Sequence, residues 1–334
     1  MTASPTILVA IYSRFLAWNI PPDNVTALRE RFPRHTFLHA RSNDEALEMA
    51  GAADILFTAV LRPDVFEAAR KLQWIHSPAA GLEFILFPAV IESPVRVTNS
   101  RGLSAETIAE HTLTMVLALF RKLPTAVEAQ RSREWAQAAI VETPLRTVAG
   151  SRVLIVGLGA IGLAAAQRFA SLGAHVDAVR RRPDLPKPSG VERVASTDRL
   201  VDLLPSADVV VLAAPETAAT RHLIGARELA AMRQGSILVN VSRGALIDEP
   251  ALASALSAPP EDRTIAGAAL DVFEQEPLPP ESLLWTLPDV LITPHVAGFR
   301  ADHWDAVCSL FAENLHRFDT GQALVNVVDK REGY

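Results

Sequence analysis

The chain has 334 residues, of which 49% are hydrophobic and 21% are charged, and its formal net charge is −6. This length suits two domains better than one, and the composition excludes collagen-like, low-complexity and disordered chains. Because the net charge is negative, the chain lacks the excess of basic residues that is typical of nucleic-acid-binding proteins, and we expect no nucleic-acid partner.

Targeting and metal-binding signals are weak in this sequence. The single cysteine, Cys308, excludes an intrachain disulfide framework and a cysteine-rich metal site. The apolar run at residues 7–11 is too short for a signal peptide, and no uninterrupted apolar stretch approaches the roughly 20 residues that span a bilayer. No pair of histidines or carboxylates has ligand spacing on one face. We therefore expect a cytoplasmic protein with no metal and no membrane partner.

The first hundred residues alternate short apolar runs with helix-like stretches, which is the pattern of βαβ units around a parallel sheet. The pattern predicts a small, five-stranded, doubly wound domain. Its strands are expected at residues 6–11, 36–38, 54–58, 73–76 and 95–98, and helices at 23–31, 44–50 and 63–70.

A second series of the same kind begins near Ser151. Six apolar runs suit a dinucleotide-binding sheet. These strands are expected at residues 152–156, 175–179, 209–213, 237–241, 265–270 and 290–293, with crossover helices at 160–172, 226–232 and 249–256.

A long helical segment separates the two series. Ser104 is suited to cap its start, and the helix is expected to run through Phe120 until Pro124 interrupts it. The stretch from there to Trp135 is polar on one side. It is either an arm that packs on a partner or a surface helix of the same monomer. Residues 301–318 form a further predicted helix, positioned to return to the first domain.

A glycine-rich loop opens the second series. Residues 152–162 read RVLIVGLGAIG, in which an apolar strand leads into Gly157, Gly159 and Gly162. The first glycine permits a tight turn, the second lets the backbone approach a pyrophosphate, and the third lets helix and strand pack closely. The helix start adds amide groups and a positive dipole end. The motif predicts dinucleotide binding, the alternative being a glycine turn that matches by chance.

The end of the next strand favours one cofactor over the other. NAD-binding sheets usually place an acidic residue there, about 20 residues after the glycines, to hold the ribose 2′-hydroxyl. Arg180 stands at that position, followed by Arg181, whereas Asp177 lies two to three residues too early. Because arginine can pair bidentately with a 2′-phosphate, we favour NADP over NAD. The alternative is a solvated basic corner in an NAD enzyme.

Three polar residues follow three different strands of the second series: Arg243, Glu276 and His295. The loops at the carboxyl ends of parallel strands converge on a ligand crevice, so the three are expected to meet. A histidine suits proton transfer to a carbonyl oxygen, a neighbouring carboxylate favours its charged form, and an arginine can bind a substrate carboxylate. Taken singly, they also fit a turn arginine, a loop carboxylate and a packed histidine.

At this point the sequence resembles a known family. The matching stretches read GLGAIG, TRHLIGARELAAMRQGSILVNVSRGALIDEPAL, GAALDVFEQEPLPPESLLWTLPDVLITPHVAG and ENLHRFDTGQALVNVVD, with SPAAGLEFI and NSRGLSAETIAEH upstream. They resemble the D-isomer-specific 2-hydroxyacid dehydrogenases.

The resemblance implies an α/β fold of two doubly wound parallel-sheet domains with a cleft between them. A flavodoxin-like substrate domain would comprise residues 1–100 and 297–334. A Rossmann nucleotide-binding domain would comprise residues 101–296, including a connecting helix at 104–135 on which a homodimer is built.

The family pattern also implies roles for individual residues. Arg243 would bind the substrate carboxylate, and His295, partnered by Glu276, would be the general acid in reduction and the base in oxidation. Ala80 and Gly81 would offer backbone amides to the substrate. The implied cofactor contacts are Gly157, Gly159, Ala160, Ile161, Gly162, Arg180, Arg181, Ala214, Pro215, Thr220, Val241, Ser242, Arg243, Asp271, His295 and Gly298.

Departures from the common pattern refine the expectation. The arginine at 180 moves the chain towards the glyoxylate and hydroxypyruvate reductases of the family, and Ala213 replaces a histidine that many members carry. We expect an NAD(P)-dependent reductase of small 2-keto acids. The alternative is a nucleotide-sensing binding module of the corepressor type. His76 is a possible cleft residue, and His111 is expected to be a surface or packing residue.

Overall fold

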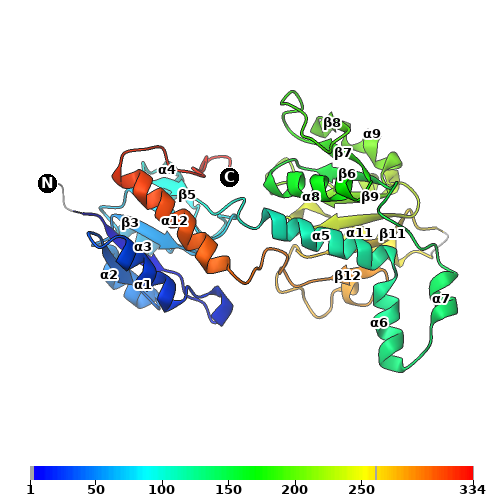
Figure 1. Ribbon diagram of the computed structural model, residues 1–334, viewed down its shortest axis with the longest axis horizontal. Coiled ribbons are helices and arrows are strands. Elements are labelled where there is room, and N and C mark those ends of the chain that lie inside the picture. Colours follow the sequence, from blue (N-terminus) through cyan, green and yellow to red (C-terminus); the bar gives the residue numbers. More distant parts are fainter. Residues whose placement is uncertain (1–3, 260–261, 334) are drawn as a thin grey trace. The chain divides into compact units, whose positions relative to one another are not determined.

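The computed structural model describes residues 4–259 and 262–333. It divides the chain into two compact units (Figure 1). Unit 1 comprises Met1–Leu103 with Arg300–Tyr334, and unit 2 comprises Ser104–Phe299, whereas the sequence placed the crossings after residues 100 and 296. Within the described ranges, no helix combines the length and the apolar character needed to cross a membrane.

Unit 1 is built on a five-stranded parallel sheet with the strand order β2-β1-β3-β4-β5. This is the order of flavodoxin-like folds, and it confirms the predicted doubly wound architecture. The strands are β1 (Thr6–Ala10), β2 (Thr36–His39), β3 (Ile55–Thr58), β4 (Trp74–His76) and β5 (Arg96–Thr98). The helices are α1 (Pro22–Arg31), α2 (Asn43–Ala50), α3 (Pro63–Ala68), α4 (Pro88–Glu92) and α12 (His303–Asp319), with a 3-10 turn η1 at Leu16–Trp18.

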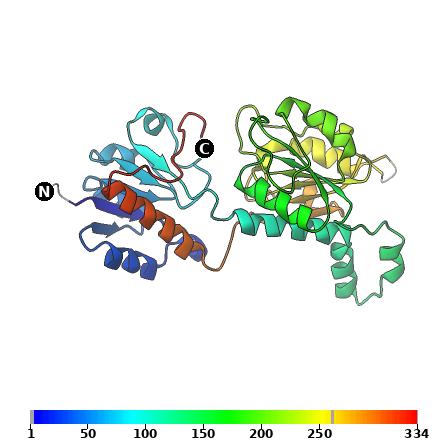
Figure 2. The same ribbon diagram turned by 45° about the horizontal axis from the view of Figure 1, so that its top comes forward.

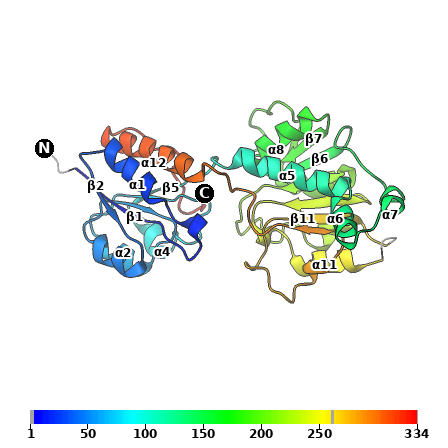
Figure 3. The same cartoon turned by 60° about the horizontal axis from the view of Figure 1, so that its bottom comes forward.

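Side chains of strand β1 alternate between the two faces of the sheet and so show the two apolar layers of this unit. Ile7 and Val9 face a cluster that includes α1 and α12, whereas Leu8 faces a cluster that includes α2, α3 and α4. Helices α1 and α12 lie side by side, as Figure 3 shows. On this face Phe311 of α12 stacks on Phe57 of β3 with ring centroids 4.3 Å apart. The C-terminal helix therefore completes the core of the first sheet.

Unit 2 is built on a parallel sheet with the order β12-β11-β10-β9-β6-β7-β8. The six strands from β8 to β11 follow the Rossmann order, and β12 adds one further strand beside β11. The prediction of six strands was short by one, because β8 was not anticipated. The strands are β6 (Arg152–Val156), β7 (His175–Val179), β8 (Arg193–Ala195), β9 (Val209–Leu212), β10 (Ser236–Asn240), β11 (Ile265–Leu270) and β12 (Val290–Ile292).

Helices cover both faces of this second sheet. One apolar cluster joins α5 and α8 to residues such as Ile155 and Val211, and the other joins α9, α10 and α11 to residues such as Leu154 and Val210. The helices are α5 (Ala105–Phe120), α6 (Leu123–Ser132), α7 (Gln137–Val141), α8 (Ala160–Ser171), α9 (Leu200–Leu203), α10 (Ala226–Ala231) and α11 (Glu249–Ser257). Short 3-10 turns lie at Thr197–Arg199, Leu204–Ser206, Gly244–Leu246 and Leu283–Trp285.

Helix α5 packs lengthwise on α8 and so belongs to the second unit. Ser104 occupies its N-cap position, but its side chain makes no capping hydrogen bond, so the predicted cap is wrong in this respect. After Phe120 the chain turns into α6 and α7, which stand away from the sheet of this unit (Figures 1 and 2). Pro124 lies in the first turn of α6, where proline is tolerated.

Candidate functional site

The glycine loop of unit 2 has the shape that a pyrophosphate requires. Gly157 has φ +101°, and a Cβ there would lie 2.7 Å from the backbone of Ala213 and Ala214. A Cβ at Gly162 would lie 1.8 Å from the carbonyl oxygen of Gly157, so helix α8 meets the loop with no room for a side chain. A Cβ at Gly159 would meet open space. The loop is closed where the backbone packs and open where a phosphate would approach.

Helix α8 begins immediately after this opening, at Ala160. Gly159 is its N-cap, and no side chain caps the first turn. The first-turn amides of Ala160, Ile161 and Gly162 therefore face no capping oxygen, and they carry the positive end of the helix dipole. Backbone amides with this dipole form a binding site for phosphate oxygens, so the residues present fit a dinucleotide.

The end of β7 carries the residues that would distinguish the two cofactors. Asp177 is buried within the strand, and its carboxylate accepts a hydrogen bond of 2.7 Å from Arg193 of the neighbouring strand β8. It is therefore unavailable to a ribose. Arg180 directs a guanidinium nitrogen to the carbonyl oxygens of Leu185 and Pro186, which fixes the loop that follows. Arg181 is exposed beside it.

The loop after β9 contains three of the predicted cofactor contacts, Ala214, Pro215 and Thr220. Ala214 is buried, and Pro215 is exposed directly after it. The hydroxyl of Thr220 donates to the carbonyl oxygen of Pro215 at 2.7 Å and accepts from the amide of Thr217 at 2.8 Å. The Thr220 hydroxyl therefore holds the conformation of this loop.

A buried asparagine at the end of β10 organises the turn that carries Arg243. The Asn240 side chain donates to the carbonyl oxygen of Arg243 at 2.8 Å and accepts from the amide and the hydroxyl of Ser242 at 3.1 and 3.0 Å. Val241 and Ser242 are buried, whereas Arg243 is partly exposed. Asn240 was not among the predicted site residues, because its only signal in the sequence is that a polar residue ends an apolar strand.

The next loop approaches this turn closely at Gly244. A Cβ at Gly244 would lie 1.8 Å from the carbonyl carbon of Phe273 and 2.2 Å from the amide of Glu274. Only glycine permits this contact, and the contact sets the distance between the Arg243 turn and the Glu276 loop. The amide of Phe273 in turn donates to Glu276 Oε1 at 3.0 Å. The amide of Glu274 donates to Glu249 at 2.6 Å.

Glu276 and His295, which are 19 positions apart in the chain, form a direct pair. His295 Nδ1 lies 2.7 Å from Glu276 Oε2, and the two side chains are 47% and 35% exposed. An ionised carboxylate can only accept, so Nδ1 carries the proton of this hydrogen bond and Nε2 is left for another partner. The pair is accessible to solvent, and the Phe273 amide holds the Glu276 carboxylate from the other side.

The neighbouring charges alter how both groups titrate. The hydrogen bond to Glu276 raises the pKa of His295, and the charge of Asp271 adds to this, whereas burial and Arg243 oppose it. Burial acts to raise the pKa of Glu276, but hydrogen bonds from His295 and from the Phe273 amide outweigh it, so the pKa of Glu276 is lowered. The pair therefore favours an imidazolium beside a carboxylate.

Asp271 holds the backbone around His295. Its buried carboxylate accepts hydrogen bonds from the amides of Val296 and Ala297, both at 3.0 Å, and its carbonyl oxygen accepts from the amide of His295 at 2.8 Å. His295 itself has φ +51°, in the left-handed region. Gly298 follows, with Ser104 about 3.5 Å from the place of its missing Cβ. Asp271 thus fixes a backbone conformation that a non-glycine residue adopts at a cost.

In unit 1, the loop after β4 presents the two predicted substrate amides. Asn99 donates to the carbonyl oxygen of Ala80 at 2.7 Å, and the amide of Ser100 donates to that of Ala79 at 3.1 Å. Within residues 4–259 and 262–333, the amides of Ala80 and Gly81 make no hydrogen bond. Hydrogen bonds thus hold the Ala79 and Ala80 carbonyls of this loop, while the amides of Ala80 and Gly81 can donate to a ligand.

The suggestion that His76 lines a cleft is wrong. Its side chain is completely buried in β4, where Nδ1 lies 2.7 Å from the hydroxyl of Thr98 and Nε2 lies 3.4 Å from that of Ser100. Burial lowers the pKa of His76 to about 3. It is a neutral core histidine that links β4 to the segment holding the Ala80 loop.

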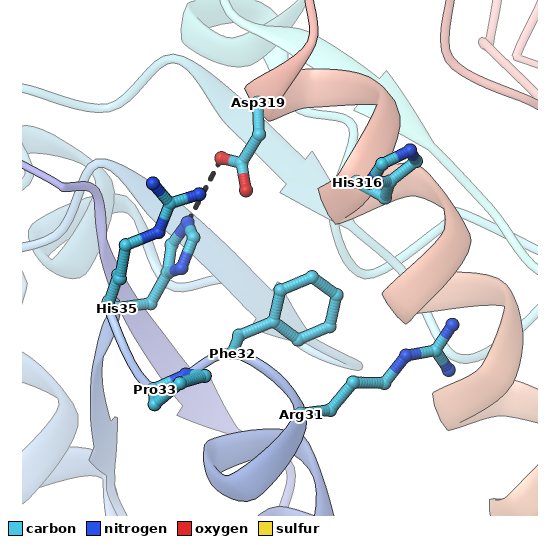
Figure 4. Close-up of a pocket in the computed structure, with 7 residues that line it drawn as sticks. Arg31, Phe32, Pro33, His35, His316 and Asp319 are labelled. Atoms are coloured by element: carbon cyan, nitrogen blue, oxygen red, sulfur yellow. Dashed lines mark hydrogen bonds and ion pairs between the residues drawn. The ribbon is translucent and has the colours of Figure 1, made fainter.

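A separate pocket of about 210 Å³ lies in unit 1 between the ends of α1 and α12. Figure 4 shows His35 bonded to Asp319 in its wall, at 3.0 Å, with Arg31 and His316 nearby. His35 precedes β2, so this pocket lies at the amino edge of the sheet, opposite to the Ala80 loop. Among the residues described, no group of three or more histidines, cysteines or carboxylates is placed to hold a metal ion.

Comparisons with known proteins agree with this geometry. The family model described as "D-isomer specific 2-hydroxyacid dehydrogenase, NAD binding domain" matches residues 113–297. A glyoxylate reductase from Korarchaeum cryptofilum is 34% identical over 328 residues, which is 95% of each chain.

Two solved structures share the whole fold. A D-isomer-specific 2-hydroxyacid dehydrogenase from Xanthobacter autotrophicus, in complex with NADPH and MES, is 31% identical with a TM-score of 0.81, over 99% of this chain and 100% of that one. An NADPH-dependent glyoxylate/hydroxypyruvate reductase from Sinorhizobium meliloti, in complex with NADP and malonate, is 28% identical with a TM-score of 0.77, over 98% of each chain.

Proposed function

Because the chain belongs to the D-isomer-specific 2-hydroxyacid dehydrogenase family, it is a pyridine-nucleotide-dependent 2-hydroxyacid oxidoreductase, and we propose that it reduces glyoxylate or hydroxypyruvate with NADPH. The observation that carries the proposal is the hydrogen bond of 2.7 Å between His295 and Glu276, with Arg243 close enough to influence the pKa of both. The relatives named above are reductases or dehydrogenases, and the corepressor alternative gains no support from them.

In this proposal His295 donates the proton that the reduced substrate requires. Its Nδ1 is held by Glu276, so Nε2 carries the proton that passes to the carbonyl oxygen of the keto acid. The raised pKa keeps His295 protonated closer to neutral pH, which favours donation in reduction. In the oxidative direction the neutral imidazole accepts the proton from the hydroxyl group of the 2-hydroxy acid.

Arg243 binds and orients the substrate. Its guanidinium can donate hydrogen bonds to both oxygens of a carboxylate in a bidentate pair, and the turn organised by Asn240 holds it near Glu276. The amides of Ala80 and Gly81 are the proposed second contact for the same carboxylate. The glycine loop with the first turn of α8 would hold the pyrophosphate of a nicotinamide dinucleotide, which when bound would supply the hydride for the reduction. Asp271 is the proposed contact at the nicotinamide end.

The preference for NADPH rests on the end of β7, where the carboxylate of the strand, Asp177, is buried and faces Arg193. Directly after the strand come Arg180, which is partly exposed, and then Arg181 and Arg182, which are exposed. Because Arg180 binds two carbonyl oxygens of its own loop, we assign it to shaping the 2′-phosphate site. We assign Arg181 to pairing with the phosphate because its side chain is exposed next to that site in the sequence. Several structures of similar proteins contain NADPH or NADP.

The homodimer is part of the same proposal. The arm formed by α6 and α7 exposes large apolar side chains, of which Leu123 is 51%, Val127 46%, Val141 60% and Trp135 88% exposed. Such side chains on a projecting segment favour burial against a second copy. Sedimentation or light scattering of the full chain tests this, and a monomer at micromolar concentration would contradict it.

The decisive experiment compares initial rates for glyoxylate and hydroxypyruvate with NADPH and NADH. We expect turnover with both keto acids and at least a tenfold higher kcat/KM for NADPH, since a charge-assisted pair contributes about 1.5–3 kcal/mol. Arg181→Gln should remove most of that preference and leave NADH kinetics unchanged. Arg152→Gln, at the amino edge of the sheet, is the matched control.

Either of two results would contradict the proposal. An NADH preference in the unaltered enzyme would show that the arginines are a solvated corner. No turnover with either keto acid would show that the substrate lies outside this class.

A further inference from the structure

We propose that His111 of α5 is a positioning residue for His295, acting through a hydrogen-bonded chain that runs from His111 to Thr293 and Asp271. His111 Nε2 lies 3.0 Å from the hydroxyl of Thr293, and that hydroxyl lies 2.6 Å from Asp271 Oδ1. All of these residues belong to unit 2. The proposal rests on the proposed role of His295 in proton transfer.

The direction of the hydrogen bonds follows from the chemistry of the three groups. Asp271 is an acceptor when ionised, so the single hydroxyl proton of Thr293 points to it. The oxygen of Thr293 can then only accept from His111, and Nε2 of His111 must carry a proton. His111 Nε2 also lies 3.7 Å from Asp271 Oδ1, so this donor lies close to the carboxylate as well as to the Thr293 hydroxyl.

Asp271 needs such support because it carries several constraints at once. Its side chain is 2% exposed, and it holds the amides of Val296 and Ala297 on either side of its carboxylate. Oδ1 is shared between Val296 and Thr293, so a rotation of the carboxylate would release both. The left-handed backbone of His295 lies between these anchors, and its conformation depends on them.

The hydrogen-bonded chain starts on helix α5, which is held in place by its packing. It is 16 residues long and packs lengthwise on α8, the helix that begins at the glycine loop. His111 is partly exposed, with 22% of its side chain accessible, and it makes its hydrogen bond to a residue 182 positions later in the chain. It therefore ties the loop that carries His295 to the same helical layer that frames the proposed cofactor site.

The test uses four variants of the full-length protein: His111→Leu, His111→Gln, Thr293→Val and the double variant His111→Leu with Thr293→Val. With glyoxylate and NADPH we expect His111→Leu and Thr293→Val each to lower kcat about tenfold, because a loosened loop misplaces Nε2. The KM for NADPH should stay within about twofold. Glutamine keeps an N–H donor, so His111→Gln should recover most of the lost kcat.

The double variant distinguishes one hydrogen-bonded chain through both residues from two separate packing effects. If the residues act in series, the double variant should be no more than about twofold slower than either single variant. Two independent losses would instead multiply to about a hundredfold. His175→Leu is the matched control, since His175 is also a histidine of unit 2 that is paired with a carboxylate, Glu192, but at the amino end of β7. It should leave kcat unchanged.

Hydrogen exchange of the Val296 and Ala297 amides provides a readout that is independent of activity. Both amides should exchange at least about tenfold faster in His111→Leu and in Thr293→Val than in the native protein and in His175→Leu. If the native protein reduces no keto acid but these amides still exchange faster, the proposed function fails while the positioning role stands. Unchanged exchange, a native kcat in His111→Leu, or equal losses in His111→Leu and His111→Gln would each overturn the proposal.

Discussion

Replacing Glu276 with glutamine removes the negative charge beside His295 while preserving the size of the side chain. In the native protein the carboxylate lies 2.7 Å from Nδ1 and raises the pKa of His295. A hydrogen bond between charged partners contributes about 1.5–3 kcal/mol. The His295 and Glu276 side chains are 47% and 35% exposed, so solvent screening places the loss at the lower end of that range.

This loss corresponds to a downward shift of about one unit in the pKa of His295, since one unit equals about 1.4 kcal/mol. Reduction requires the protonated imidazole, so its rate is constant below the pKa and falls above it. In Glu276→Gln the fall should begin about one pH unit lower. Oxidation requires the neutral imidazole, so its rising limb should move to lower pH by the same amount.

The assay is the pH dependence of kcat/KM for glyoxylate reduction with NADPH and for glycolate oxidation with NADP, each measured for the native enzyme and for Glu276→Gln. Glu274→Gln is a control in the same loop, because Glu274 pairs with His222 and not with His295. We also expect the absolute rate of Glu276→Gln to fall by roughly 10–100-fold, because the ring is less well oriented. An unchanged break in both pH profiles would refute the assignment of Glu276 as the partner that raises the pKa of His295.

Three further predictions concern other parts of the structure. Gly244→Ala forces a methyl group against Phe273, so it should destabilise the protein by about 1–3 kcal/mol and reduce turnover more than tenfold. Gly267→Ala would place a methyl group 2.4 Å from the carbonyl oxygen of Asp289, in the first half of β11, and it should destabilise the protein without moving the pH profile. Arg243→Lys loses bidentate pairing, so kcat/KM for the keto acid should fall at least about tenfold with little change in cofactor affinity. Because the pKa of buried His76 is about 3 in the folded state, the free energy of unfolding should decrease by about 1.4 kcal/mol per unit as pH falls below about 6.5, and urea titrations of His76→Asn should lack this component.

Most strands of both sheets were predictable because parallel strands that are buried on both faces appear as short, continuous apolar runs. β8 escaped because it is only three residues long and follows an exposed loop rich in proline and arginine. Its residue Arg193 pairs with Asp177, a contact that no local pattern indicates. An edge strand of this kind is defined by its neighbour and not by its own sequence.

The site divides in the same way. Arg243, Glu276 and His295 could be proposed from the sequence because each follows an apolar strand, and the structure places Glu276 and His295 in direct contact. His111 could not, since it lies on an amphipathic helix and meets Thr293 only through the packing of α5. For His76 the sequence offered a cleft position as a possibility, and the structure excludes it. His76 ends a strand that leads into a predicted substrate loop, yet both faces of that strand are buried.

The measurement that tests the account most directly is the turnover of His295→Gln compared with its affinity for NADPH. Glutamine cannot donate a proton as an acid, so the rate of glyoxylate reduction should fall by about 10²–10⁴-fold. The dissociation constant of NADPH, measured by fluorescence titration, should stay within about threefold of the native value, because the glycine loop and the arginines after β7 are unaltered. Near-native turnover in His295→Gln, with cofactor binding intact, would contradict the proposed role of this histidine in catalysis.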